Sequence, residues 1–179
     1  MPGRLMPFLY HRRPPELRGD VLYPLNTLRE LHPDLYEDER AKYDRRESLL
    51  ELRIPILDVL WNDALHLSPF HPARVAAAWR DAGLSPESLA DPFFQIPVER
   101  IDHRRAVWFP SGALPLDDVA PFDRAAYREP TELPAAYVEH VRRRGGEGRR
   151  LRAFAHLPHV LVAAPVDVTG LAVVTAESA

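Results

Sequence analysis

The sequence predicts an α+β domain in which two small mixed or antiparallel β-sheets lie around a cleft, with helices at the periphery. Apolar segments with strand character come in consecutive groups, at residues 93–101 and 105–110 and again within residues 150–174. Segments with helical periodicity separate these groups, an order that favours antiparallel or mixed pairing over a doubly wound parallel sheet. The chain has 179 residues, 46% of them hydrophobic, so residues 1–179 are expected to form one domain with a substantial core.

The N-terminal part predicts a strand and then a helix. Residues 5–11, LMPFLYH, form a short apolar strand, which the prolines of the following HRRPP stop. Residues 19–28 continue as a turn and an extended segment. The stretch PDLYEDERAKY, residues 33–43, predicts a helix because a proline opens it and its acidic residues precede its basic ones, in agreement with the helix dipole.

The middle of the chain contains the clearest helix. The apolar stretch 49–61 is broken at Pro55, so a helix or strand ends there and a connector follows. Residues 63–68, DALHLS, alternate as a strand. Residues 72–82 begin with a proline and end before Gly83, as helices do. The apolar stripe of this helix consists of Val75, Ala78, Trp79 and Ala82.

The C-terminal half predicts strands at 93–101 and 105–110, separated by a charged turn. A proline-rich loop follows at 115–134 and runs over the surface. Residues 134–144 predict a helix that two glycines end, and residues 150–174 predict two or three strands rich in valine and leucine.

The composition excludes several classes of function. There is no cysteine, so disulfides, thiolate metal sites and cysteine nucleophiles are excluded. The net charge of −3, from 23 basic and 26 acidic residues, argues against wholesale binding of a phosphate backbone. No apolar run approaches the roughly 18–20 residues of a membrane span, so we expect a cytoplasmic protein without membrane contact.

The core stretch WNDALHLSPFHP, residues 61–72, carries more polar side chains than a buried strand needs. Strand alternation places Asn62, His66 and Ser68 on one face and Asp63 on the other. A solvated sheet face is one interpretation. The apolar sequence on both sides favours a cleft wall instead.

Two further segments carry candidate binding residues. His11 ends the first strand, where ligands commonly lie, although a histidine at a strand end is often structural. Arg45 and Arg46 follow the predicted helix, and either the planar fork of an arginine binds a phosphate there or both side chains face water.

A metal site and a serine hydrolase site both lack support. His156 and His159 have H-x-x-H spacing, but in an extended segment residues three apart point to opposite faces and do not converge on one ion. The chain contains no G-x-S-x-G elbow, no phosphate-binding loop and no G-x-G-x-x-G turn.

Taken in chain order, these stretches resemble the ADP-ribosyltransferase-like fold, and within it the DarT-type DNA ADP-ribosyltransferases. That family opens with a histidine-bearing strand, continues with an arginine and a strand ending in S-P, and closes with a strand that supplies a catalytic glutamate. The corresponding stretches here are LYH, YDRR, DALHLSP and PHVLV. The sequence is also similar, over more of its length, to small bacterial proteins that share LYPLN, WND with HLSP, and PHVLV.

The resemblance implies that NAD is the substrate and lies along the polar face of the core strand. The residues it implies for NAD binding are His11, which would contact the ribose next to nicotinamide, together with Asn62, His66, Ser68 and Arg45. A phosphate or the acceptor would lie near the arginines.

The catalytic residues implied by the resemblance are His159, Arg46 and Asp63. His159 stands where the family has its glutamate. A neutral imidazole cannot supply that negative charge, although it can act as a general base. Asp63 or Glu139 would then replace the missing acid.

The implied function is transfer of ADP-ribose from NAD to a nucleic acid base, a small molecule or a protein, or hydrolysis of NAD. A nucleic acid acceptor would make single-stranded nucleic acid a partner. One alternative is a non-catalytic module that binds a nucleotide or nucleic acid on the same fold, and the missing glutamate favours it. The other is a metal hydrolase built from His66, His71, His156 and His159.

Overall fold

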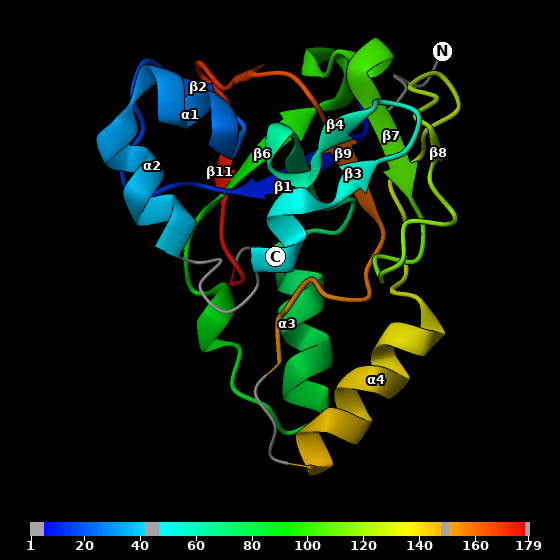
Figure 1. Cartoon of the computed structure of the whole chain (residues 1–179). Helices are drawn as coiled ribbons and strands as arrows, with labels where there is room; N and C mark the ends of the chain where they lie inside the picture. Colours follow the sequence, from blue (N-terminus) through cyan, green and yellow to red (C-terminus); the bar gives the residue numbers. More distant parts are fainter. Residues whose placement is uncertain (1–5, 42–46, 148–150, 178–179) are drawn as a thin grey trace, which may run out of the picture.

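The computed structural model describes residues 6–41, 47–147 and 151–177 and has the predicted α+β class (Figure 1). Within these ranges there are four α-helices, and the pairings between named strands are antiparallel. The described part of the chain is therefore not a doubly wound parallel sheet.

Two sheets make up the centre of the molecule. The first has the order β1-β6-β11, with bounds Phe8–Arg12, Phe93–Pro97 and Val173–Val174. The second has the order β5-β9-β7-β8, with bounds Leu65–Leu67, His159–Val162, Ala106–Phe109 and Ala120–Pro121. Two smaller sheets pair β2 (Val21–Leu22) with β10 (Val166–Asp167) and β3 (Arg53–Ile54) with β4 (Val59–Leu60).

The helices form two groups that lie far apart in Figure 1. The first group is α1 (Leu25–Leu31) and α2 (Pro33–Arg40), which stand beside β2. The second is α3 (Pro72–Asp81) and α4 (Ala135–Gly146), which pack together at the other end. Short 3-10 helices connect the elements: η2 (Glu47–Glu51), η3 (Trp61–Asp63), η4 (Glu87–Leu89), η5 (Val98–Arg100) and η6 (His103–Arg105).

The apolar core has three parts. The largest joins the two central sheets and includes Leu9, Leu65, Ile96 and Val160. The second lies under α3 and α4 and includes Val75, Trp79, Phe93 and Tyr137. The third lies under the β3–β4 hairpin and includes Ile54, Phe109 and Leu161. Each part buries the apolar face of one element against another, which is the main favourable term in folding.

The helix predicted at residues 72–82 is confirmed as α3. Its N-cap His71 accepts a backbone N–H of the first turn at Nδ1, at 3.1 Å. Val75 and Trp79 are buried as predicted, whereas Ala76 is fully buried and Ala78 only partly. The buried stripe is therefore turned slightly from the predicted one.

Several local predictions need correction. The strand expected from Asp63 begins at Leu65, because Trp61–Asp63 form η3. The segment expected to be extended up to residue 28 instead enters α1 at Leu25. The strands at 93–97 and 106–109 exist but belong to different sheets. The helix expected to reach residue 43 is described as far as Arg40, and residues 42–46 lie outside the described part.

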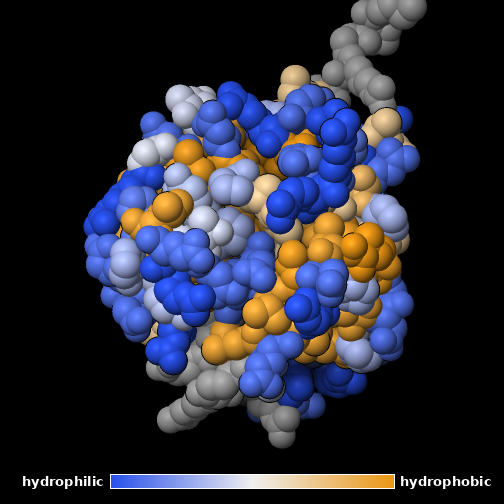
Figure 2. All heavy atoms as spheres, turned by 45° about the horizontal axis from the view of Figure 1, so that its top comes forward, coloured by the Kyte–Doolittle hydropathy of each residue, from blue (hydrophilic) through white to orange (hydrophobic). Residues whose placement is uncertain are grey.

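The outer surface combines a largely polar side with an apolar area, as Figure 2 shows for one face. The most exposed large apolar side chains come from separate elements, for example Leu31 of α1, Ile56 of the β3–β4 turn and Leu114 after β7. In the ranges that the structure describes, no helix is both long and apolar enough to cross a membrane.

Candidate functional site

A pocket of about 330 Å³ lies between the first helix pair and the place where the two central sheets meet. Residues 14–18, which connect β1 to β2, form one wall. α1 and α2 form a second, and η3 with the start of β5 forms a third. Much of the lining is apolar, from leucines of all three walls and from Val21 and Leu22 of β2.

An isolated antiparallel bridge joins the two central sheets in the described part of the chain, between Tyr10 of β1 and Ser68, the residue after β5. The backbone N–H of Tyr10 donates to Ser68 at 2.7 Å, and that of Ser68 donates to Tyr10 at 2.8 Å. Because the two strands run antiparallel, residues after Tyr10 and residues before Ser68 lie on the same side of the bridge. This is why His11 of β1 and His66 of β5 both line the pocket.

Hydrogen bonds to backbone carbonyls orient both histidines. The Nδ1–H of His11 donates to the carbonyl of Arg12 at 2.7 Å. The Nε2–H of His66 donates to the carbonyl of Trp61 at 3.2 Å, and its ring stands edge to face on the Trp61 indole, with centroids 4.1 Å apart. A carbonyl can only accept, so in neutral His66 the proton is on Nε2 and Nδ1 is an acceptor.

His66 is uncharged at neutral pH. Burial lowers its pKa to about 4, and repulsion from His11 acts in the same direction. The hydrogen bond to Trp61 opposes this shift. The pocket therefore receives a neutral imidazole that can accept a hydrogen bond.

Asn62 is the most unusual polar residue of the pocket. Its side chain lines the pocket although the residue is only 4% exposed. Its Oδ1 atom is buried and accepts no hydrogen bond from any described group. An unpaired buried acceptor costs about 1–3 kcal/mol, so such atoms are rare without a functional reason. Because Asn62 lines the pocket, this unpaired acceptor is the first candidate to receive a hydrogen bond from a ligand.

Two other predicted residues of this segment have structural roles outside the pocket. The Oδ2 atom of Asp63 accepts the backbone N–H of Leu60 at 2.9 Å, and Oδ1 accepts the side-chain amide of Asn26 at 2.8 Å. Asp63 thus caps η3 and ties it to α1. The hydroxyl of Ser68 accepts the N–H of Phe70 at 3.0 Å and stabilises the turn before α3. Neither residue lines the pocket, so the predicted binding role of Ser68 and catalytic role of Asp63 lack a geometric basis.

His159 is not among the residues that line the pocket. β9 pairs with β5 so that His66 lies opposite Leu161, which puts His159 two residues further along on the same face. Its Nδ1–H donates to the carbonyl of Leu157 at 2.8 Å. Burial and repulsion from His66 lower its pKa to about 4. The expected position of His159 in one cleft with His11 therefore finds no support in the lining of this pocket.

The histidines proposed as metal ligands are not gathered at one point. His156 lies in the turn before β9 and packs on His140 of α4, with ring centroids 4.3 Å apart. His71 caps α3. Among the residues that the structure describes, no three histidine or carboxylate side chains are grouped so as to hold a metal ion.

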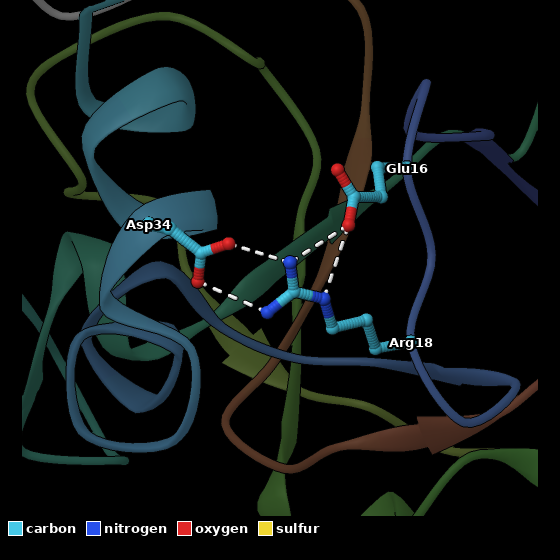
Figure 3. Close-up of polar contacts among 3 residues, drawn as sticks. All are labelled: Glu16, Arg18 and Asp34. Carbon is cyan, nitrogen blue, oxygen red and sulfur yellow. Dashed lines mark hydrogen bonds and ion pairs between the residues drawn. The ribbon is translucent and has the colours of Figure 1, made fainter.

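Arg45 and Arg46 lie outside the described residues. The arginine that the structure places in the pocket wall is Arg18, between β1 and β2. It forms ion pairs with Glu16 of the same wall and Asp34 of α2 (Figure 3). Arg18 stands alone between Pro15 and Gly19 and belongs to no recognisable motif, so it could not be selected from the sequence.

Glu129, whose carboxylate holds β1 in place, was also not selected from the sequence. Glu129, from the loop before α4, accepts the backbone N–H of Phe8 at 3.1 Å and the hydroxyl of Tyr10 at 2.7 Å. Burial, with help from this bond, raises the pKa of Tyr10 above its usual range, so the hydroxyl remains a donor. These two hydrogen bonds fix the strand that carries His11.

Acidic side chains contribute more to the described walls than basic ones. Glu16, Asp38 and Glu39 line the pocket together with one arginine, which is itself paired with carboxylates. With Asn62 Oδ1 and neutral His66, these groups make a site that accepts hydrogen bonds. It suits a moiety with N–H or O–H donors.

Comparison with known proteins assigns no family. The resemblance to ADP-ribosyltransferases rests on the short stretches LYH, YDRR, DALHLSP and PHVLV. No protein-family model, no curated protein and no solved structure matches this chain.

Proposed function

We propose that this chain is a nucleotide-binding protein that takes the base-and-sugar end of its ligand into the pocket, and that the nicotinamide riboside half of NAD is that end. The unpartnered, buried Oδ1 atom of Asn62 in the pocket wall carries this proposal. A carboxamide N–H or a ribose hydroxyl would supply the hydrogen bond that this atom lacks.

The size of the pocket supports a nucleoside-sized moiety. Small-molecule pockets span about 300–1,000 Å³, and about 330 Å³ is at the lower end of that range. The pocket therefore suits one base and its sugar better than a whole dinucleotide. The remainder of NAD would extend past the pocket mouth.

The chemistry of the walls also favours nicotinamide over a phosphate. The nicotinamide ring of NAD is a cation with a donor-bearing carboxamide. Glu16 and Asp38 supply negative charge, and Asn62 and His66 supply acceptors, so the wall complements such a ring. The leucines contact its faces.

We further propose that the bound NAD reacts, either by ADP-ribosyl transfer or by hydrolysis. The fold proposed for this reaction is ADP-ribosyltransferase-like. That chemistry needs a negative charge near the ribose as nicotinamide leaves. His159 is neutral and does not line the pocket, so we assign this role to a carboxylate of α2. Asp38 and Glu39 both line the pocket and are the candidates. In transfer, the base or protein acceptor would approach the same carboxylate.

Isothermal titration calorimetry with nicotinamide riboside, NAD and adenosine tests the proposal. Nicotinamide riboside and NAD should bind with a stoichiometry of one, and Asn62→Leu should weaken both by about tenfold or more, because the replaced acceptor no longer pairs with the ligand. Ser68→Ala is the matched control, since Ser68 is buried in the same segment but lies outside the pocket. The Ser68→Ala variant should bind both ligands with the affinity of the wild type.

Absence of binding by all three compounds would refute the proposal. For the reaction, release of nicotinamide from NAD should fall in Asp38→Asn or Glu39→Gln by about 10²–10³-fold, the usual effect of losing a group that stabilises transition-state charge. Binding without nicotinamide release in the wild type would leave a non-catalytic nucleotide-binding protein and refute the transfer reaction.

A further inference from the structure

Arg18 lies between the pocket and a carboxylate outside it. Its Nη1 donates to Asp34 Oδ1 at 3.0 Å, and its Nη2 donates to the other oxygen of the same carboxylate. Its Nε and Nη2 donate to one oxygen of Glu16, at 3.0 and 2.8 Å (Figure 3). Arg18 and Glu16 line the pocket, whereas Asp34 does not.

The Arg18–Asp34 pair has the geometry of an anion site. Two parallel N–H donors of a guanidinium match two oxygens of a carboxylate, and they match two oxygens of a phosphate equally well. The pKa of Asp34 is held below its ordinary value, first by the hydrogen bond from Arg18 and also by backbone amides of Asp34 and Leu35. The carboxylate is therefore charged and fills this anion site in the unliganded chain.

The pair is exposed enough to exchange partners. The side chains of Arg18 and Asp34 are 40% and 60% exposed. Exposed ion pairs are weak and salt-sensitive, so a ligand anion can displace the carboxylate at little cost. A phosphate would accept from the same two N–H donors that now bind Asp34. Replacing the carboxylate by the phosphate therefore leaves neither donor unpaired.

We infer that Arg18 binds a phosphate of the ligand at the pocket mouth, where that phosphate displaces Asp34. The inference rests on the proposed function, because a base and sugar inside the pocket put the attached phosphate at its mouth. The unpaired Oδ1 atom of Asn62, on another wall, is an independent observation that supports a ligand in this pocket. Arg18 thus distinguishes a nucleotide from a nucleoside. Competition from Asp34 determines how much more tightly the nucleotide binds.

Calorimetric titrations at constant ionic strength, with nicotinamide riboside, nicotinamide mononucleotide and NAD, test this role. Arg18→Gln should weaken the two phosphate-bearing ligands about tenfold more than it weakens nicotinamide riboside, because a charged hydrogen-bond donor to the phosphate is lost. Asp34→Asn should strengthen the same two ligands by about two- to fivefold, since the competing charge is gone. Added salt should weaken nicotinamide mononucleotide more than nicotinamide riboside.

The matched controls are Arg53→Gln and Asp58→Asn. Arg53 and Asp58 form another exposed ion pair, with N and O 2.9 Å apart, in the β3–β4 hairpin and outside the pocket. These variants should bind all three ligands like the wild type.

Three outcomes would overturn the inference, and they differ from failure of the proposed function. Equal loss of nicotinamide riboside and nicotinamide mononucleotide in Arg18→Gln would mean that Arg18 shapes the wall and does not read the phosphate. An equal gain in affinity for both ligands in Asp34→Asn would mean that the Arg18–Asp34 ion pair only restricts entry of the ligand into the pocket. Unchanged binding in both variants would place the phosphate elsewhere. If none of the three ligands binds the wild type, the proposed function itself fails.

Discussion

At the scale of single residues, Asn62 has opposite effects on the stability of the unliganded protein and on ligand binding. Its buried Oδ1 atom has no partner among the described groups, which costs the folded state free energy. Side chains with such a cost usually persist because a site needs them. The same atom that weakens the unliganded fold would thus hold the ligand.

Asn62→Leu should raise the free energy of unfolding of the unliganded protein by about 1–2 kcal/mol, because an apolar side chain of similar size removes the unpaired acceptor. Urea denaturation measures this change. Ser68→Ala should lower the same quantity, since the Ser68 hydroxyl already has hydrogen-bond partners at 3.0 and 3.2 Å. Destabilisation by Asn62→Leu would show that the asparagine serves the fold.

The two partly buried histidines, His66 and His159, make stability depend on pH. Burial lowers the pKa values of His66 and His159 to about 4, below the ordinary value of 6.5. As the pH falls below 6.5, the unfolded chain binds protons that the folded chain does not. The stability that these groups contribute is therefore complete above pH 6.5 and is lost as the pH falls towards 4.

Urea denaturation at pH 7, 6, 5 and 4.5 should show this loss. A difference of 2.5 pH units in pKa corresponds to about 3 kcal/mol for one group between pH 6.5 and 4. His159→Gln should make the decline less steep, and His103→Gln, at an exposed position, should not. Stability that stays level over this range would contradict the assignment of neutral histidines.

At the scale of the elements, the turns before β8 and β9 depend on one close approach. Gly112 has φ +58°, and a Cβ atom added there would lie 1.7 Å from the carbonyl oxygen of Leu157. The carbonyl of Gly112 also accepts the backbone N–H of His156 at 3.1 Å. This contact holds the turn that leads into β9 and so fixes the position of His159 at the start of that strand.

Gly112→Ala should lower the free energy of unfolding by about 3 kcal/mol or more, because the backbone strain adds to a clash that only a backbone shift can relieve. Gly170→Ala is the control, since Gly170 has φ +68° but a Cβ there meets nothing within 4 Å. It should cost about 1 kcal/mol. Thermal denaturation of the two variants compares them, and equal losses would show that the contact with Leu157 is unimportant.

The elements that the sequence predicted well are those with a strong local signal. α3 has a proline at its start, a glycine after its end and an apolar stripe, and it forms almost as predicted. α1 was missed because its seven residues, LNTLREL, have no side-chain cap and no fully buried residue. η3 was missed because Asp63 stabilises it through contacts with Leu60 and with Asn26, which is 37 residues away.

At the scale of the whole molecule, the two central sheets create the pocket by meeting at one bridge and helices close it. His11, Asn62 and His66 could be selected from the sequence because each is a polar residue in an apolar segment. Ser68 could not be distinguished from them, since only the fold shows that its hydroxyl is used by a turn. The walls from α2 and the β1–β2 connection depend on tertiary packing.

A crystal structure of the protein with bound nicotinamide riboside would show whether the pocket is the binding site. We expect one ligand between the α1–α2 wall and β5, with its nicotinamide and ribose inside the pocket. A ligand N–H or O–H should donate to Asn62 Oδ1, and the ring should lie within contact of His66. A ligand bound elsewhere, or one in the pocket that leaves Asn62 Oδ1 unpaired, would contradict the role proposed for Asn62.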